Sequence, residues 1–120
     1  MDEVLINRVA FLKKIQIFEE LTESALLKIA ELLQEIWVKQ GETVFKQGDE
    51  SNGIYFVKEG CIQIHNDNYD FTVVSTDQFF GEYALLDDQA RSLTATTVID
   101  SHLYLLNKTD FFEAMSVEPS

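Results

Sequence analysis

The chain has few of the residues that constrain small domains covalently or sterically. It contains one cysteine, Cys61, and one proline, Pro119, in 120 residues. A single cysteine excludes an intramolecular disulfide, so the chain is not a disulfide-stabilised secreted scaffold, and a reducing, cytoplasmic compartment is expected. Because the proline stands near the C-terminus, it interrupts none of the predicted strands.

Basic residues are also scarce. Nine Lys and Arg against twenty-one Asp and Glu give a formal net charge of -12. Such a field repels phosphate backbones and anionic lipid headgroups, so we expect neither nucleic acid nor membrane as a partner of this domain. No apolar run is long enough to span a bilayer, and Asp2 and Glu3 stand where a signal peptide carries basic residues.

The length and the 46% hydrophobic content fit one domain, residues 1–120, with a single core. Residues 1–37 are predicted to form N-terminal helices, because apolar residues recur there every three to four positions. Thr22 is the expected N-cap of the second helix, whose apolar stripe runs from Leu26 to Trp37. The large aromatic residues expected in the core are Phe11, Phe18, Trp37, Phe45 and Phe56.

From residue 38 the pattern changes to short β-type runs separated by glycine-marked corners. The runs cover residues 43–46, 53–58, 61–65, 71–75, 93–99 and 102–107. Many short strands predict a sandwich or barrel over residues 38–107, so the fold class is mainly β with flanking α-helices. A further helix is expected to start over residues 110–115, capped by Asn107 or Thr109.

Residues 80–94, FGEYALLDDQARSLT, carry the chemistry of an anion site. Gly81 lets the backbone approach a ligand closely, and Ala84 and Leu85 are suited to start a helical turn with outward amide groups. Arg91 adds a planar, permanently charged fork that matches two phosphate oxygens. The composition alone leaves an alternative open, in which Arg91 pairs with Glu82, Asp87 or Asp88 in a solvated turn.

This segment resembles the phosphate-binding cassette of the cyclic-nucleotide-binding domain family. The upstream motifs GETVFKQGD, residues 41–49, and YFVKEG, residues 55–60, are similar to the barrel pattern of the same family. The resemblance covers residues 11–115. It implies a double-stranded β-helix, also called a jelly-roll barrel, that binds cAMP or cGMP as a ligand, holds no prosthetic group and is not an enzyme.

The resemblance also implies roles for individual residues. Arg91 would pair with the exocyclic phosphate and Glu82 would accept a hydrogen bond from the ribose 2′-hydroxyl. The remaining ligand-binding positions that the family pattern implies are Ile64, Phe71, Gly81, Tyr83, Ala84, Leu85, Ser92 and Leu93. Because no arginine in residues 71–75 is placed to recognise guanine, cAMP is expected over cGMP.

Two departures from the family pattern lie at the end of the cassette. Ala90 stands where the family has proline, which predicts a looser cassette before binding. Leu93 stands where a small residue is usual, so it either narrows the pocket or points into the core. An alternative function follows from these departures: a fold that no longer binds nucleotide and serves as a protein-interaction domain.

The favoured function is a regulatory module that transmits ligand binding through residues 1–21 and 110–115 to a fused or associated effector. A homodimer is an oligomeric state that the resemblance allows. Two further hypotheses are a metal-binding barrel, for which His65 and His102 are too few and too far apart in sequence, and a haem sensor with Cys61 or His65 as the axial ligand. A lone cysteine in a strand is more often a small core residue. No nucleophile elbow or Walker loop is present in the sequence.

Overall fold

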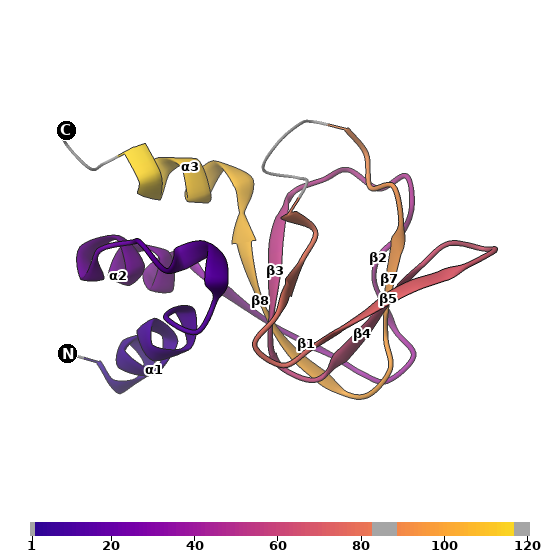
Figure 1. Cartoon of the computed structure of the whole chain (residues 1–120), viewed down its shortest axis with the longest axis horizontal. Helices are drawn as coiled ribbons and strands as arrows, with labels where there is room; N and C mark the ends of the chain where they lie inside the picture. Colours follow the sequence, from indigo (N-terminus) through magenta and orange to yellow (C-terminus); the bar gives the residue numbers. More distant parts are fainter. Residues whose placement is uncertain (1, 83–88, 117–120) are drawn as a thin grey trace.

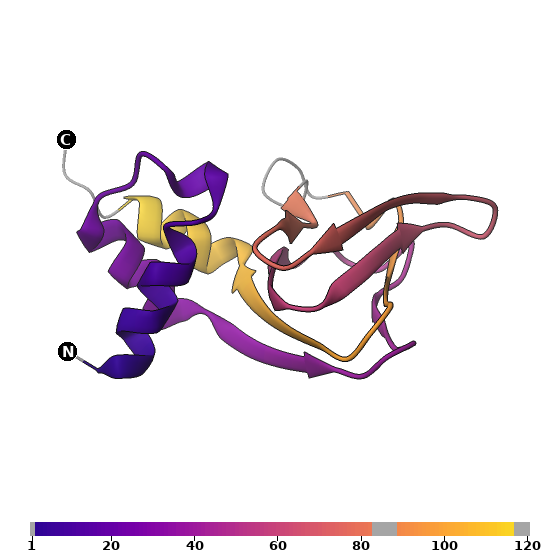
Figure 2. The same cartoon turned by 60° about the horizontal axis from the view of Figure 1, so that its bottom comes forward.

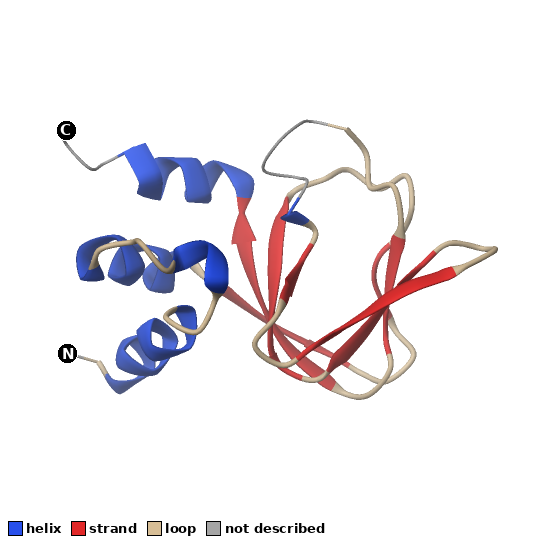
Figure 3. Cartoon of the chain, in the orientation of Figure 1, coloured by secondary structure: helices blue, strands red, loops and turns tan. Residues whose placement is uncertain are grey.

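The helices of the chain gather at one end and its strands at the other (Figure 1, Figure 3). This arrangement comes from a computed structural model, which describes residues 2–82 and 89–116. Within those ranges no helix has the length and apolar character needed to cross a bilayer.

The N-terminal helices begin at side-chain caps. Helix α1, Glu3–Leu12, starts where the Asp2 carboxylate accepts a hydrogen bond from the backbone N–H of Val4 at 2.8 Å. Helix α2, Glu23–Leu32, starts where the Thr22 hydroxyl accepts one from the N–H of Ala25 at 3.1 Å, as the sequence predicts. A short 3-10 helix, Gln16–Phe18, joins them.

The prediction of helix up to residue 37 is wrong. Helix α2 ends at Leu32, and residues Gln34–Val38 form strand β1. Ile36 and Val38 point into the β-unit, whereas Trp37 lies on the other face and is 72% exposed instead of buried in the core. Helical and strand spacings are hard to separate over such a short apolar run, so periodicity did not reveal the change.

In the described part of the chain, eight strands form two four-stranded antiparallel sheets. One sheet has the order β1-β8-β3-β6 and the other β2-β7-β4-β5. Their bounds are β1 Gln34–Val38, β2 Thr43–Phe45, β3 Gly53–Glu59, β4 Cys61–His65, β5 Asp70–Ser75, β6 Phe79–Phe80, β7 Thr94–Thr97 and β8 Ser101–Asn107. Every predicted strand is present, and β1 and β6 are additions.

Each face of the first sheet has its own apolar cluster. Strands β3 and β8 alternate between the two clusters, because successive side chains of a strand point to opposite faces. Val57 and Leu103 face the second sheet, in the interior of the barrel. Phe56 and Tyr104 face the helices, where Phe18 packs on Phe56 at 5.5 Å between ring centroids. The helices therefore share a core with the strands that form the wall of the barrel (Figure 2).

Helix α3, Lys108–Ser116, follows β8 without a linker. The Asn107 side chain accepts a hydrogen bond from the N–H of Thr109 at 2.9 Å, which confirms Asn107 as a cap. The helix starts two residues before the predicted range and packs against α2. Strand β8 thus leads directly from the barrel into the helical layer.

Candidate functional site

A cavity of about 550 Å³ opens between the inner face of the second sheet and the segment around Arg91. This volume falls within the roughly 300–1,000 Å³ that is typical of small-molecule sites. Its described lining residues are Phe45, Ser51, Ile64, Thr72, Val74, Phe79, Phe80, Gly81, Glu82, Gln89, Ala90, Arg91, Ser92 and Leu93. Most of the wall is apolar, and four of its polar residues, Glu82, Gln89, Arg91 and Ser92, belong to the segment that contains Arg91.

Arg91 is the cation among the described residues of this wall, and neutral acceptors hold its side chain in place. It is only 6% exposed. Its Nη1 donates to the carbonyl of Gly81 at 3.0 Å, and its Nη2 donates to the carbonyl of Gly53 at 2.8 Å and to Oδ1 of Asn52 at 3.3 Å. These bonds fix the plane of the guanidinium before any ligand arrives.

Aromatic rings surround the same guanidinium. Its central carbon lies 4.1 Å from the centroid of the Phe45 ring and 5.8 Å from that of Tyr55. Burial lowers the pKa of Arg91 from its usual value, and burial likewise raises the pKa of the Tyr55 hydroxyl. Arginine stays protonated in proteins, so the site holds a largely dehydrated cation stacked on a ring.

The guanidinium retains donor capacity. Its Nε is buried and has no hydrogen-bond partner among the described residues, and Nη1 donates to Gly81 with one of its two N–H groups. Within residues 2–82 and 89–116 no carboxylate forms an ion pair with Arg91. The alternative partner Glu82 lines the cavity, while Asp87 and Asp88 lie outside the described residues. A buried cation with free donors is a binding element for an anion.

The backbone of Arg91 connects two sequence motifs that are far apart in the chain. Its N–H donates to the carbonyl of Asp49 at 2.7 Å, and its carbonyl accepts from the N–H of Gly48 at 2.8 Å. The GETVFKQGD motif and the end of the 80–94 segment are therefore parts of one structural unit. The same upstream motif supplies Phe45, on which the guanidinium stacks.

The structure brings together six of the predicted site residues. The residues that line the cavity are Ile64, Gly81, Glu82, Arg91, Ser92 and Leu93. Tyr83, Ala84 and Leu85 lie outside the described residues. Leu93 lies at the wall just before β7, and a cavity of about 550 Å³ remains beside it.

Phe71 is the predicted site residue that does not join the others. The register of β4 and β5 pairs Ile64 with Thr72, so Thr72 shares the inner face and Phe71 points the other way. Phe71 is 54% exposed and its ring contacts that of Tyr69. The residues of β5 that line the cavity are Thr72 and Val74. Pairing of Thr72 with Ile64 would have predicted both, because alternate residues of a strand share a face.

The residues that position Arg91 are not among those predicted from the sequence. Asn52 and Gly53 accept its hydrogen bonds, and Tyr55 lies beside its ring partner Phe45. Nothing in the local sequence relates them to Arg91, because the contact spans 38 to 39 positions of the chain. A Cβ added at Gly53 would clash with the carbonyl oxygen of Leu106, so the structure requires glycine at this position.

The two histidines proposed for a metal lie in different sheets. His65 contacts Oγ1 of Thr96 through Nε2 at 2.8 Å, and His102 lies 3.4 Å from Glu35 on the other sheet. Across the described part of the chain, no group of three His, Cys, Asp or Glu side chains is placed to hold a metal ion.

Comparison with known proteins places this cavity in context. A family model described as the cyclic nucleotide-binding domain matches residues 35–118. A Rhodopseudomonas palustris protein, named as a potassium channel protein, is 32% identical over 110 residues, which are 89% of this chain and 27% of that protein. The type II regulatory subunit of the Drosophila melanogaster cAMP-dependent protein kinase is 33% identical over 77% of this chain and 24% of the subunit.

A solved structure agrees with these relatives. The regulatory domain of Toxoplasma gondii PKA, crystallised with cAMP, superposes with a TM-score of 0.86 at 25% identity, covering 95% of this chain and 46% of that one. The chain spans about a quarter of the length of the two curated relatives above.

Proposed function

The chain belongs to the cyclic nucleotide-binding domain family, and from this premise we propose that the cavity beside Arg91 binds cAMP in preference to cGMP. The observation that carries the proposal is the buried guanidinium of Arg91, which lines the cavity. Its Nε has no hydrogen-bond partner among the described residues, and its Nη1 uses one of its two N–H groups on the Gly81 carbonyl. A cyclic phosphate carries one negative charge and two exocyclic oxygens, which suit these donors. Its charge would offset a cation that burial has separated from water.

Neighbouring groups would then orient the rest of the nucleotide. Glu82 lines the same cavity as Arg91, and we assign it the ribose 2′-hydroxyl, which can donate to its carboxylate. Ser92 offers a hydroxyl, and the open backbone at Gly81 permits close approach of the phosphate. Replacing the 2′-hydroxyl by hydrogen would leave the Glu82 carboxylate without that partner and lower the affinity.

The expected preference for cAMP follows from the apolar residues of the cavity wall. Guanine presents the acceptors O6 and N7 on one edge, where a cationic side chain would favour it. Apart from Arg91, the described residues of the wall include no Lys or Arg, and Ile64, Val74 and Leu93 offer apolar contact to a base. The free-energy cost of desolvation in such surroundings is smaller for adenine than for guanine, because adenine has no carbonyl oxygen.

A chain of contacts links the phosphate position to helix α3. Nη2 of Arg91 bonds the Asn52 side chain, and the Asn52 carbonyl accepts from the N–H of Lys108, the first residue of α3, at 2.9 Å. We propose that a ligand that shifts Arg91 also shifts this helix and thereby an attached or associated effector. The amide chemical shifts of Lys108 and Thr109 should change during a cAMP titration. Unchanged shifts at saturation would contradict this link.

The function is tested by calorimetric titration with cAMP, cGMP and 5′-AMP. We expect saturable 1:1 binding of cAMP, weaker binding of cGMP, and much weaker binding of 5′-AMP, whose open and doubly charged phosphate does not match the cyclic geometry. The absence of binding by both cyclic nucleotides at millimolar concentration would overturn the proposal. Tighter binding of cGMP would overturn only the preference.

Substitution of Gly81 with alanine, compared with the same change at Gly41, separates the effect of backbone strain from the effect of displacing the Arg91 guanidinium. Gly81 has φ +77°, and an added Cβ would lie 2.7 Å from Nη1 of Arg91. Gly41 is the matched control, with φ +81° and open space around its Cβ position. Both alanine variants are expected to lose about 1–2 kcal/mol of stability, because both place a side chain in the left-handed region.

Only Gly81→Ala should also weaken cAMP binding, by about fivefold or more, since the displaced guanidinium no longer meets the phosphate. Urea unfolding and calorimetry measure the two effects separately. Equal affinities of the two variants for cAMP would show that the Gly81 contact does not position Arg91 for the ligand.

A further inference from the structure

A second hollow lies on the outer face of the first sheet, away from the nucleotide cavity. Its volume is about 370 Å³, and its described lining residues are Trp37, Val38, Lys39, Glu59, Asp100, Ser101 and His102. Trp37 lies on the outer face of β1, beyond the region that the helices cover. Its partner on β8 is His102, which is not part of the apolar cluster under the helices, whereas Tyr104 of β8 is. None of these residues belongs to the cavity described above.

Trp37 is both exposed and fixed in position. It is 72% exposed, yet its indole stacks on the His102 imidazole with centroids 3.8 Å apart and planes 11° from parallel. The His102 ring in turn meets the Tyr104 ring edge-on at 5.3 Å. One face of the indole is thus occupied and the other is turned to solvent. An aromatic ring held rigid at a surface loses little conformational entropy when a partner covers it, which is typical of interface anchors.

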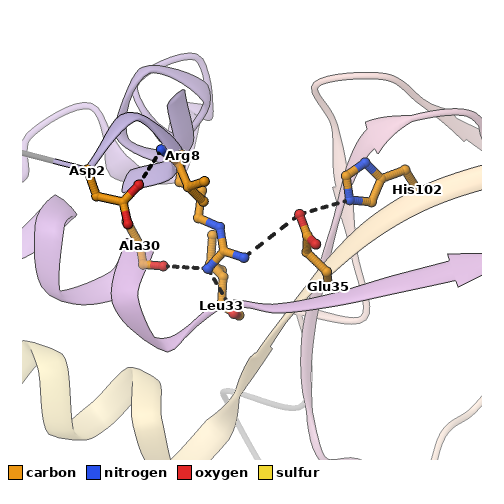
Figure 4. A network of polar contacts seen from close by, with 7 residues as sticks. Asp2, Arg8, Ala30, Leu33, Glu35 and His102 are labelled. Carbon is orange, nitrogen blue, oxygen red and sulfur yellow. Dashed lines mark hydrogen bonds and ion pairs between the residues drawn. The ribbon is translucent and has the colours of Figure 1, made fainter. Parts of the chain in front are cut away.

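A series of polar contacts runs from the stack to helix α1 (Figure 4). Nε2 of His102 lies 3.4 Å from a Glu35 carboxylate oxygen, and the same oxygen lies 3.8 Å from Nη2 of Arg8. Arg8 also donates through Nη1 to the carbonyls of Ala30 and Leu33, at the end of α2. The surface around Trp37 is therefore connected to both N-terminal helices.

The charges beside the indole favour a cationic partner. Glu59 and Asp100 line the hollow and are exposed, and Glu35 follows along the same face of β1. Asp100 is fixed, because its Oδ1 accepts a hydrogen bond from the N–H of Gln40 at 2.8 Å. Lys39 is the opposing charge at the rim, and the net charge of the chain is -12. An aromatic face bordered by carboxylates is complementary to a guanidinium, which stacks on the ring and bonds a carboxylate through its edge.

We propose that this hollow is a docking site for a basic segment of a partner protein, with an arginine side chain stacked on Trp37 and its N–H groups directed to Glu59 and Asp100. Val98 and Ile99, on the turn that ends at Asp100, are 42% and 49% exposed and extend the surface with apolar contact area. Arginine fits better than lysine, because only its planar group makes both the stacking contact and a two-pronged bond to a carboxylate.

The test uses two labelled peptides, one of alternating arginine and glycine residues and one with lysine in place of each arginine. Fluorescence anisotropy at about 0.15 M salt, where distant charges are screened, measures their affinities for the whole domain. We expect the arginine peptide to bind more tightly than the lysine peptide. The emission of Trp37, the only tryptophan in the sequence, should change with the same midpoint.

Three variants decide between a specific site and general attraction to an acidic protein. Trp37→Leu is expected to lower the affinity for the arginine peptide by about fivefold or more, because the cation–π contact is lost. Glu59→Gln should also weaken it, whereas Glu31→Gln, which removes the same charge from an exposed position on α2, should not. Equal binding of both peptides with no effect of Trp37→Leu would overturn the proposal, as would no binding of the arginine peptide at millimolar concentration.

Discussion

Replacing Arg91 with alanine is expected to weaken cAMP binding by at least about thirtyfold, the result of truncating one member of a buried, charge-assisted pair. The guanidinium is fixed by the carbonyls of Gly53 and Gly81 and stacks on Phe45, so water cannot readily replace it. Calorimetric titration of the folded variant measures the loss. The lost interaction is to the phosphate, so cAMP and cGMP should be weakened by a similar factor.

Two further variants define what the effect means. Arg91→Lys keeps the charge but cannot bond two carbonyls and stack at once, so we expect it to recover only part of the affinity. Arg8→Ala removes an arginine that is also partly buried. It contacts Ala30, Leu33 and Glu35, none of which lines the cavity. This variant should lower stability without a comparable loss of affinity. A folded Arg91→Ala variant with unchanged affinity would remove the basis for placing the phosphate here.

Replacing Phe56 with alanine is expected to lower the free energy of unfolding by about 3–5 kcal/mol, a large fraction of the total for a domain of this size. Phe56 is fully buried in the central strand β3, and its ring packs on Phe18 in the layer between helices and sheet. Its removal leaves a cavity in the apolar cluster between the helices and the first sheet, which the surrounding side chains fill only partly.

The matched control is Phe71→Ala, which truncates the same residue type at a position that is 54% exposed. We expect it to change stability by less than about 1 kcal/mol and to leave cAMP affinity unchanged, because Phe71 points away from the cavity. Urea unfolding followed by circular dichroism measures both variants. Similar losses for Phe56→Ala and Phe71→Ala would contradict the division of the structure into buried and exposed faces.

Local signals predicted most of the fold. Thr22 and Asn107 act as helix caps because their side chains bond amides within the next few residues, an interaction that the adjacent sequence determines. The strands were found because alternation and glycine corners are also local. The boundary between α2 and β1 was not predicted. Trp37 continues an apolar spacing that fits a helix, but its pairing with His102 places it in a strand.

The site was predictable to the extent that it is contiguous in the chain. Gly81, Glu82 and Arg91 fall within one motif, and all three line the cavity. The supporting residues Asn52 and Gly53 could not be predicted, since their relation to Arg91 depends on how the β3 end lies against the cassette. Phe71 illustrates a third limit, because a one-residue difference in register changes which face of a strand lines a cavity.

The most direct test of the central claim is a crystal structure of the domain with cAMP. We expect the exocyclic phosphate oxygens within hydrogen-bond distance of the Arg91 guanidinium and the ribose 2′-hydroxyl within that distance of the Glu82 carboxylate. A nucleotide bound elsewhere on the domain, or a phosphate without contact to Arg91, would contradict the account.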